Sequence, residues 1–463
     1  MAETVDQIAL ELDGLRSISS DEIRARQDQR LADIVRYHYN SPLNSSYRDL
    51  LKAHGIEDAS DLPTSVDQIA RLPTVTRAFL ADSQYAEHPA VPTGQVRKII
   101  ETSGTSGNPL RIPHTNESVL RCYGEMLVRS AILGQMQPTD SSYSIVHWVP
   151  GVKDVWASHE GTIAFQDIVG ANHAMIVSTH TTPEEHWRNW QTSQPKWALS
   201  APVFFLAFAS FGERMHLDLA SCSLERLLLG AVTCLPDDQQ FIVKTYGLKG
   251  VHFFYSTSES FIPSAELPDR SGYLCFEDEF VVEVLDYDGE PVSPGERGQI
   301  AITCLGNRGY PCIRYRQGDA VTYLGYSSDF PGCQVFSDIQ RVDAGEIGEA
   351  RIPYSEIDMM PRHLTKLGIP VRALQIARRR EGLKDVPLFR IETPVEDRSA
   401  VERALLQVFT RNSQMKDMLD GGIICPPVVE IYPPGALSRG RLKVPVYVDE
   451  RDASNAEVLI GRH

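Results

Sequence analysis

The chain has 463 residues, of which 42% are hydrophobic and 23% charged, so it is long enough to build more than one compact core. Its formal charge of −16 opposes non-specific binding to nucleic acid, because neutralising phosphates requires a basic face. No apolar run reaches the roughly 18 residues needed to cross a bilayer, and the first residues lack a secretory pattern, so we expect a soluble cytoplasmic protein without a membrane partner.

Eight cysteines are scattered along the chain without CxxC spacing, which in a reducing compartment indicates free thiols. Cys275, Cys312 and Cys333 fall in one region and could converge on zinc, but no histidine stands at ligand spacing beside them. Free thiols are therefore the favoured interpretation.

The N-terminal part, to about residue 90, is predicted to be a helical cap. DEIRARQDQRLADIVRYHY carries apolar residues at helical spacing, and SPLNSSYRDLLKAHG begins with Ser and Asn and ends with Gly. These patterns predict helices across residues 20–55.

From about residue 96, short β-branched runs alternate with helix-like segments such as NESVLRCYGEMLVRSAIL. The runs VRKII, SYSIVHWV, LERLLLGAV and GVHFFY in this alternation predict βαβ units and a mainly parallel sheet. Residues 279–325 differ, because EFVVEVLDYDGEPV predicts a strand pair around the turn signal Asp288-Gly289. This part is expected to be an antiparallel subdomain.

A second, smaller alternation follows residue 343. VRALQIARR, VPLFRIETP, AVERALLQVFTRN and PPVVEIYPPG predict a compact α+β domain. We therefore expect an α/β fold with a large N-terminal domain, residues 1–342, and a small C-terminal domain, residues 343–463.

The segment IIETSGTSGNPLRIPHT places a Thr/Ser/Gly loop directly after a β-branched run. Glycine lets backbone N–H groups approach phosphate oxygens and the hydroxyls add neutral donors, so the loop can hold a triphosphate. It is not a Walker A loop, since GKS and GKT are absent, and it does not fit GxGxxG. A flexible turn is the alternative. The predicted phosphate-binding residues are Thr102, Ser103, Gly104, Thr105, Ser106 and Gly107.

TSGTSGNP resembles the phosphate loop of the adenylate-forming superfamily, which includes acyl- and aryl-CoA synthetases, luciferases and peptide-synthetase adenylation domains. Many members place Lys after Gly-x-Pro, whereas this chain has Leu110, as does the phenylacetate-CoA ligase branch. YNSPLNSSYRDLLKAHGI and LPTVTRAFL are similar to the opening segment of that branch. The resemblance implies that ATP and a carboxylic acid form an acyl-AMP and pyrophosphate, and that a nucleophile then takes the acyl group.

Two further segments carry the resemblance into the nucleotide site. FFYSTSES is similar to the Tyr-Gly-x-Ser/Thr-Glu motif, with Ser256 in place of the usual Gly, and implies Tyr255 against adenine, Ser258 near the phosphates and Glu259 on Mg²⁺. A hard cation that bridges phosphates prefers a carboxylate, and an aromatic ring suits a purine. YPCIRYRQGDA implies Asp319 as the acceptor for both ribose hydroxyls. An ordinary strand-end pair and a turn aspartate are the alternatives.

The hinge and the adenylation lysine are implied further along. Gln340-Arg341-Val342-Asp343 resembles the Gly-Arg-x-Asp hinge, with Arg341 near ribose or phosphate and Asp343 as the pivot of a mobile C-terminal domain. VEIYPPGALSRGRLKVPV places Lys443 where a mobile ammonium stabilises the charge that develops as pyrophosphate departs. A solvated basic loop is the alternative. The family also implies a homodimer.

The acid pocket of this branch is implied to lie after the phosphate loop and before Tyr255. An aromatic pair on a strand suits a flat acid, although such pairs also serve as core packing. The implied pocket residues are His147, Trp148, Leu229, Gly230 and Ala231.

The loop after the hinge departs from the CoA ligases, which carry Arg-Gly there. RVDAGEIGEARIPYSEID holds Gly348-Glu349 or Glu349-Ala350 at these positions, and an acidic side chain repels the phosphates of CoA. ATP and Mg²⁺ are therefore expected, and CoA is doubtful. Two alternatives remain open: a non-CoA acceptor in secondary metabolism, such as an amine, a carrier-protein thiol or nitrite-dependent diazotisation, and a catalytically idle nucleotide-binding relative.

Overall fold

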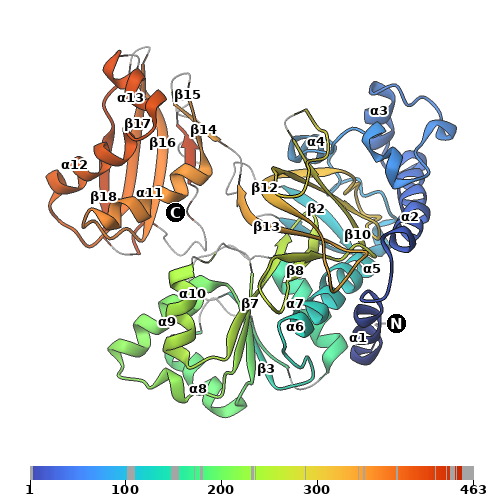
Figure 1. Ribbon diagram of the computed structural model, residues 1–463, viewed down its shortest axis with the longest axis horizontal. Helices are drawn as coiled ribbons and strands as arrows, with labels where there is room; N and C mark the ends of the chain where they lie inside the picture. Colours follow the sequence, from blue (N-terminus) through green and yellow to red (C-terminus); the bar gives the residue numbers. More distant parts are fainter. Residues whose placement is uncertain are drawn as a thin grey trace. The chain divides into compact units, whose positions relative to one another are not determined.

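The structure, a computed structural model, describes most of the chain as two compact units (Figure 1). Among the described residues, the larger unit ends at Ile339 and the smaller begins at Gln340. None of the helices in these segments is both long and apolar enough to cross a membrane. The described residues are 4–101, 110–147, 156–170, 173–177, 181–230, 234, 236–286, 288–341, 344–347, 350–381, 384–422, 424–433, 435–437, 444 and 446–450.

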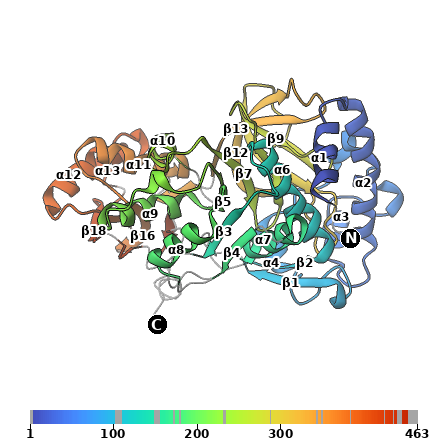
Figure 2. The same ribbon diagram turned by 90° about the horizontal axis from the view of Figure 1, so that it is seen from below.

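Helices gather at one end of the larger unit, where Figures 1 and 2 show α1, α2 and α3 in blue. The apolar stripe of α2 is buried, and a reciprocal capping box closes its start: the Ser19 hydroxyl accepts from the Glu22 N–H (3.2 Å), and the Glu22 carboxylate accepts from the Ser19 N–H (3.0 Å). The predicted helices thus lie where the spacing placed them. The elements are α1 (Val5–Gly14), α2 (Ser20–Asn40), α3 (Ser46–Ala53), η1 (Ala59–Asp61), η2 (Val66–Arg71), α4 (Arg77–Asp82) and η3 (Thr93–Gln95).

The first β-branched run does not join the parallel sheet, contrary to expectation. Strand β1 (Val96–Glu101) pairs antiparallel with β2 (Arg111–Thr115) in a separate two-stranded sheet. The connection between them is too short for the crossover helix that parallel pairing requires. The helical segment after β2 contains α5 (Asn116–Val119), η4 (Leu120–Glu125) and α6 (Met126–Leu133).

The centre of the larger unit is an 11-stranded mixed sheet in the order β10-β11-β12-β13-β9-β8-β7-β6-β5-β3-β4. Strands β4, β3, β5, β6 and β7 are parallel, as the alternation predicted. They are β3 (Ser142–His147), β4 (His173–Val177), β5 (Trp197–Ser200), β6 (Arg226–Leu229) and β7 (Gly250–Thr257), with helices α7 (Trp156–Val169), α8 (Pro183–Ser193), α9 (Pro202–Arg214), η5 (Leu219–Ser221) and α10 (Pro236–Tyr246).

Helices cover both faces of these parallel strands. On β6, Leu228 faces the cluster that contains Phe165 of α7, whereas Leu227 and Leu229 face the cluster built from α8, α9 and α10. Trp190 of α8 is 1% exposed at the centre of the second cluster. Alternate side chains of one strand thus serve two cores, which explains why the strands are apolar throughout.

The other half of the sheet is antiparallel, but one predicted pairing is wrong. Gly289 adopts φ +90° at the expected turn, yet the chain beyond it makes only a single bridge, Leu285 to Pro291. Pro291 and Pro294 lack the N–H that a ladder needs, so β10 pairs with β11 instead. The strands are β8 (Phe261–Glu266), β9 (Tyr273–Cys275), β10 (Phe280–Leu285), β11 (Arg297–Cys304), β12 (Tyr315–Tyr326) and β13 (Gln334–Arg341).

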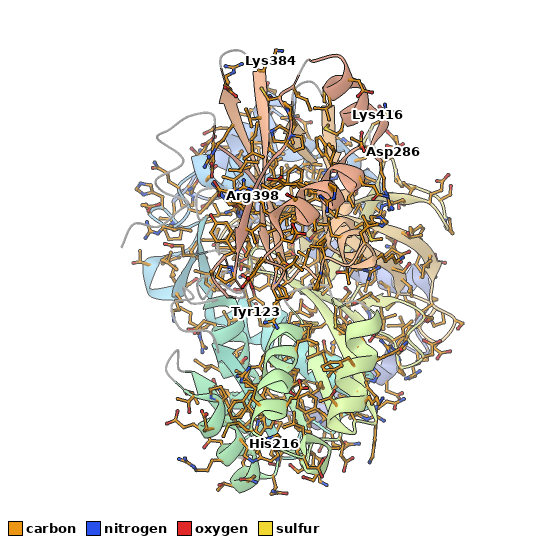
Figure 3. The ribbon with its side chains drawn as sticks, turned by 90° about the vertical axis from the view of Figure 1, so that its left-hand side faces the viewer. Tyr123, His216, Asp286, Lys384, Arg398 and Lys416 are labelled. Atoms are coloured by element: carbon orange, nitrogen blue, oxygen red, sulfur yellow. The ribbon has the colours of Figure 1, made fainter. Side chains whose placement is uncertain are left out.

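The smaller unit is an α+β structure around a four-stranded sheet in the order β18-β17-β16-β19. Its core joins Ile376 and Phe389 of the sheet to Leu364, Leu405 and Phe409 of the helices. Lys384 lies at the tip of the β16–β17 hairpin (Figure 3). The elements are β14 (Ala344–Ile347), β15 (Ala350–Pro353), α11 (Tyr354–Lys366), β16 (Ala373–Glu381), β17 (Lys384–Glu392), α12 (Arg398–Phe409), α13 (Ser413–Asp420), β18 (Val428–Tyr432) and β19 (Tyr447–Asp449).

A buried carboxyl links helix α2 to the sheet. Glu277 accepts from the side-chain amides of Gln27 (2.6 Å) and Gln334 (2.7 Å). Burial raises the pKa of Glu277 to about 7, although both hydrogen bonds and Arg24 act to lower it. Because this pKa exceeds that of an unfolded glutamate, the carboxyl stabilises the fold at low pH, and the contribution is lost as the pH rises through 7.

Glu277→Gln is therefore expected to raise the free energy of unfolding by about 2 kcal/mol at pH 8 and to change little near pH 4. Thermal melting across this range measures the effect. Glu117→Gln, at an exposed position of α5, is the control and should melt like the wild type at every pH. A Glu277→Gln variant that melts below the wild type at pH 8 would contradict this account.

Candidate functional site

A tight turn between β7 and β8 carries two of the predicted nucleotide-site residues. The turn spans Ser258–Ser260, and Phe261 enters β8 with φ +64°. The Thr257 hydroxyl closes the turn, because it accepts from the Ser260 N–H (2.9 Å) and contacts the Ser260 hydroxyl (2.7 Å). Ser258 and Glu259 therefore project from a fixed backbone.

Three buried rings hold this backbone from behind. Tyr123, labelled in Figure 3, donates to the carbonyl of Thr257 (3.1 Å), and Tyr310 donates to that of Glu259 (2.6 Å). His114 of β2 lies 3.1 Å from the carbonyl of Ser258, and burial lowers the pKa of His114 to about 3. A neutral imidazole with its proton on Nε2 satisfies this contact. The turn is thus anchored to elements far away in the sequence.

The Glu259 carboxylate forms an ion pair with Arg77. The guanidinium Nη1 lies 2.8 Å from Oε1, and the side chains are 29% exposed for Arg77 and 10% for Glu259. Tyr315 makes a second side-chain hydrogen bond to this carboxylate. The sequence reasoning assigned no role to Arg77, although it lies in LPTVTRAFL, a segment that carries the family resemblance.

The surroundings of Glu259 fit a magnesium ion that arrives with phosphates. No group of three or more His, Cys, Asp or Glu side chains that could hold a metal occurs within the described ranges. A cation at Glu259 would therefore take its other ligands from phosphate oxygens and water, which is how Mg²⁺ is commonly bound.

A second carboxylate is linked to the same turn. Asp319, 5% exposed, accepts a hydrogen bond from the Tyr255 hydroxyl (2.7 Å). The amide nitrogen of Gln317 donates to that hydroxyl, and its oxygen accepts from Thr257 (3.0 Å) and Ser260 (2.9 Å). The structure thus brings Tyr255 and Asp319 together and connects them to the turn that carries Glu259.

Gln317 is a further residue that the sequence reasoning did not single out. It lies two positions before Asp319 in YRQGDA, so the motif marked its neighbourhood. Its contacts with Tyr255, Thr257 and Ser260 depend on how β12 lies against the β7–β8 hairpin, and no local pattern reports that.

The end of β6 contributes to the predicted acid pocket. Leu229 is fully buried in the core that α8, α9 and α10 share. A Cβ atom added to Gly230 would lie 2.4 Å from Cζ of Phe254, so this ring packs directly on the glycine. Phe254 is half-buried, and it is an aromatic neighbour of the pocket that the sequence reasoning missed.

Several predicted residues lie outside the described ranges. β3 ends at His147 and β13 ends at Arg341, but the side chains of these two residues are not described. The predicted residues without any description are Thr102, Ser103, Gly104, Thr105, Ser106, Gly107, Trp148, Ala231, Asp343, Gly348, Glu349 and Lys443.

The described chain before Lys443 is anchored by a buried carboxylate. Glu392, at the end of β17, accepts from the N–H of Gly435 (2.6 Å) and that of Leu437 (3.1 Å). Glu392 is 4% exposed, so these bonds lie away from water. The PPG-x-L segment of the small unit therefore starts from a fixed point.

Comparison with known proteins adds relatives of one kind. No protein-family model matches the chain. The phenylacetate-coenzyme A ligase of Thermus thermophilus is 25% identical over 322 residues, which cover 68% of each chain. That of Escherichia coli is 26% identical over 322 residues, 68% of this chain and 70% of the ligase.

Solved structures share the fold over nearly the whole chain. The 2-hydroxyisobutyryl-CoA ligase in the postadenylation state, in complex with 2-HIB-AMP, matches with a TM-score of 0.68 at 20% identity, over 94% of this chain and 90% of the ligase. The AtGH3.15 acyl acid amido synthetase, in complex with 2,4-DB, matches with a TM-score of 0.63 at 14% identity, over 99% and 96%.

Proposed function

We infer that this chain, which belongs to the adenylate-forming superfamily of AMP-forming ligases, uses ATP to activate an aromatic carboxylic acid as an acyl-adenylate. One observation carries the proposal: the buried carboxylate of Asp319 and the ion-paired carboxylate of Glu259 belong to one network through Tyr255 and Gln317. Two carboxylates with different surroundings suit two different parts of ATP.

In this proposal Asp319 accepts hydrogen bonds from the ribose hydroxyls, and Tyr255 fixes the orientation of its carboxylate. Glu259 would hold Mg²⁺, which when bound offsets the negative charge of the phosphates. The hydroxyls and backbone N–H groups of Thr102–Gly107 surround the triphosphate.

The chemical step transfers AMP to the acid. A carboxylate oxygen of the acid attacks the α-phosphorus, a P–O bond forms, and the bond from that phosphorus to the bridging oxygen of pyrophosphate breaks. Lys443 and Arg341 stabilise the charge that moves onto the departing oxygens. No proton is transferred, so the task of these residues is positioning and electrostatic stabilisation.

The acid is proposed to be aromatic because of the residues around Gly230. The ring of Phe254 packs on Gly230, and His147 and Trp148 would add two further flat groups. Gly230 and Ala231 lack bulky side chains, which leaves room for a ring beside them.

Gly230→Ala is expected to raise KM for the acid about 10-fold and to leave KM for ATP unchanged, because one misplaced methyl group in a pocket has an effect of this size. The added methyl would displace the Phe254 ring, whose nearest atom lies 2.4 Å away. Gly94→Ala is the matched control, since a Cβ added there meets nothing within 4 Å. Equal effects of Gly230→Ala on both KM values would contradict the pocket assignment.

The second candidate function differs only in the acceptor. Glu349 stands where CoA ligases carry a residue of the pantetheine-binding loop, and its negative charge favours an acceptor without phosphates. An amine, a carrier-protein thiol or nitrite with an aryl amine would then replace CoA.

Mass spectrometry tests both steps. The protein is incubated with ATP, Mg²⁺ and a panel of aryl and aliphatic acids, and the mixture is searched for adenylates. CoA, amines, thiols and nitrite are then added separately. We expect an aryl-adenylate before any acceptor is present. Binding of ATP without an adenylate from any acid would favour a catalytically idle relative.

A further inference from the structure

We propose that Arg77 is a phosphate-binding residue that keeps free Mg²⁺ off Glu259 until the metal arrives with ATP. This inference rests on the proposed nucleotide site. It assigns a role to an ion pair that joins two parts of the chain 182 positions apart.

Arg77 is held in place by its backbone. It is the first residue of α4, whose N-cap Thr76 accepts from the N–H of Phe79 (3.2 Å). The preceding residue, Val75, accepts from the N–H of Arg316 (2.9 Å) on β12. The guanidinium therefore approaches Glu259 from a segment fixed against the strand that also carries Asp319.

The exposures of the two partners differ in a useful way. The Arg77 side chain is 29% exposed and that of Glu259 is 10% exposed, so the cation is the more accessible member of the pair. An incoming anion can reach the guanidinium, whereas a lone metal ion must displace it to reach the carboxylate.

Charge then decides which ligand enters. A divalent cation alone loses affinity, because Arg77 already balances the single negative charge of Glu259 and repels a second cation. A triphosphate with its metal brings several negative charges, and an arginine side chain can bind phosphate oxygens through two N–H groups. Arg77 can therefore turn from the carboxylate to the phosphates while the metal takes its place.

The proposal predicts opposite effects of one substitution on two ligands. Arg77→Gln is expected to bind Mn²⁺, without nucleotide, about 10-fold tighter than the wild type, and to raise KM for MgATP about 10-fold or more. Arg77→Lys keeps the charge and should stay within about threefold of the wild type for Mn²⁺ while binding MgATP less well, since lysine lacks the fork. Electron paramagnetic resonance of Mn²⁺ reports the first effect and ATP–pyrophosphate exchange the second.

Two further variants locate the effect. Arg77→Gln combined with Glu259→Gln should lose the added Mn²⁺ affinity. Arg398→Gln is the matched control, because Arg398 also begins a helix and pairs with a glutamate, Glu402, at 2.8 Å. It should change neither reading. Circular dichroism verifies that each variant is folded.

The outcomes separate this inference from the proposed function. Unchanged or weaker Mn²⁺ binding by folded Arg77→Gln overturns the exclusion of free metal, and an unchanged KM for MgATP overturns the phosphate role. If the wild type shows no acid-dependent exchange, the proposed function fails, and the Mn²⁺ comparison still decides whether Arg77 excludes metal from Glu259.

Discussion

Asp319→Asn is expected to lower kcat/KM for ATP about 100-fold while KM for the acid stays within about twofold, because a charged acceptor of two ribose hydroxyls is lost. The amide offers one acceptor oxygen, and its nitrogen would face donors, including the Tyr255 hydroxyl that now donates to Asp319 at 2.7 Å. ATP–pyrophosphate exchange at varied ATP measures the change. 2′-Deoxy-ATP adds a second reading, since the wild type should discriminate against it and the variant should not.

The control for this substitution is Asp286→Asn. Asp286, labelled in Figure 3, follows β10 and accepts from the N–H of Glu290 (2.9 Å), so its carboxylate serves a turn rather than the proposed site. It should retain wild-type kinetics. If Asp319→Asn keeps the preference for ATP over 2′-deoxy-ATP, Asp319 does not bind the ribose.

Lys443→Ala has the second large expected effect, a loss of about 100- to 1,000-fold in the rate of adenylation with little change in the Kd for ATP. The ammonium would act on charge that develops only as pyrophosphate departs, so its removal affects kcat more than binding. Single-turnover formation of the adenylate, measured beside equilibrium binding of ATP, separates these two quantities.

A second lysine of the same unit is the control for this variant. Lys384→Ala, at the exposed tip of the β16–β17 hairpin (Figure 3), removes the same charge and should leave adenylation unchanged. Equal rates for wild type and Lys443→Ala would remove this lysine from the adenylation step and leave Arg341 as the cation to test next.

Local patterns predicted the elements well where one segment contains its own signal. The capping box of Ser19 and Glu22 and the apolar spacing behind it mark α2 without reference to any other part of the chain. The alternation of β-branched runs and helices likewise predicted the parallel strands β3 to β7, because each strand is buried on both faces.

Strand partners were harder to predict than strands. The run at β1 was assigned to the parallel sheet, and β10 was paired across the turn at Gly289, and both pairings were wrong. Strand propensity reports a half-buried extended segment and carries no information about which strand lies beside it. Connection length for β1 and the prolines after Gly289 were the signals that would have corrected these pairings.

The candidate site shows the same division. Family motifs named Tyr255, Glu259 and Asp319, and the structure links them through hydrogen bonds. Arg77 and Gln317 were missed because their roles arise from contacts between α4, β12 and the β7–β8 hairpin. An arginine after a helix cap is common, and only the carboxylate it meets in space makes it a site residue.

ATP–pyrophosphate exchange without CoA or any other acceptor tests the central claim most directly. Labelled pyrophosphate is supplied with ATP, Mg²⁺ and one acid at a time from a panel of aryl acids. The account predicts that label enters ATP only when a suitable aryl acid is present, and that Asp319→Asn reduces this incorporation. Tight binding of ATP with no acid-dependent incorporation from any member of the panel would contradict it.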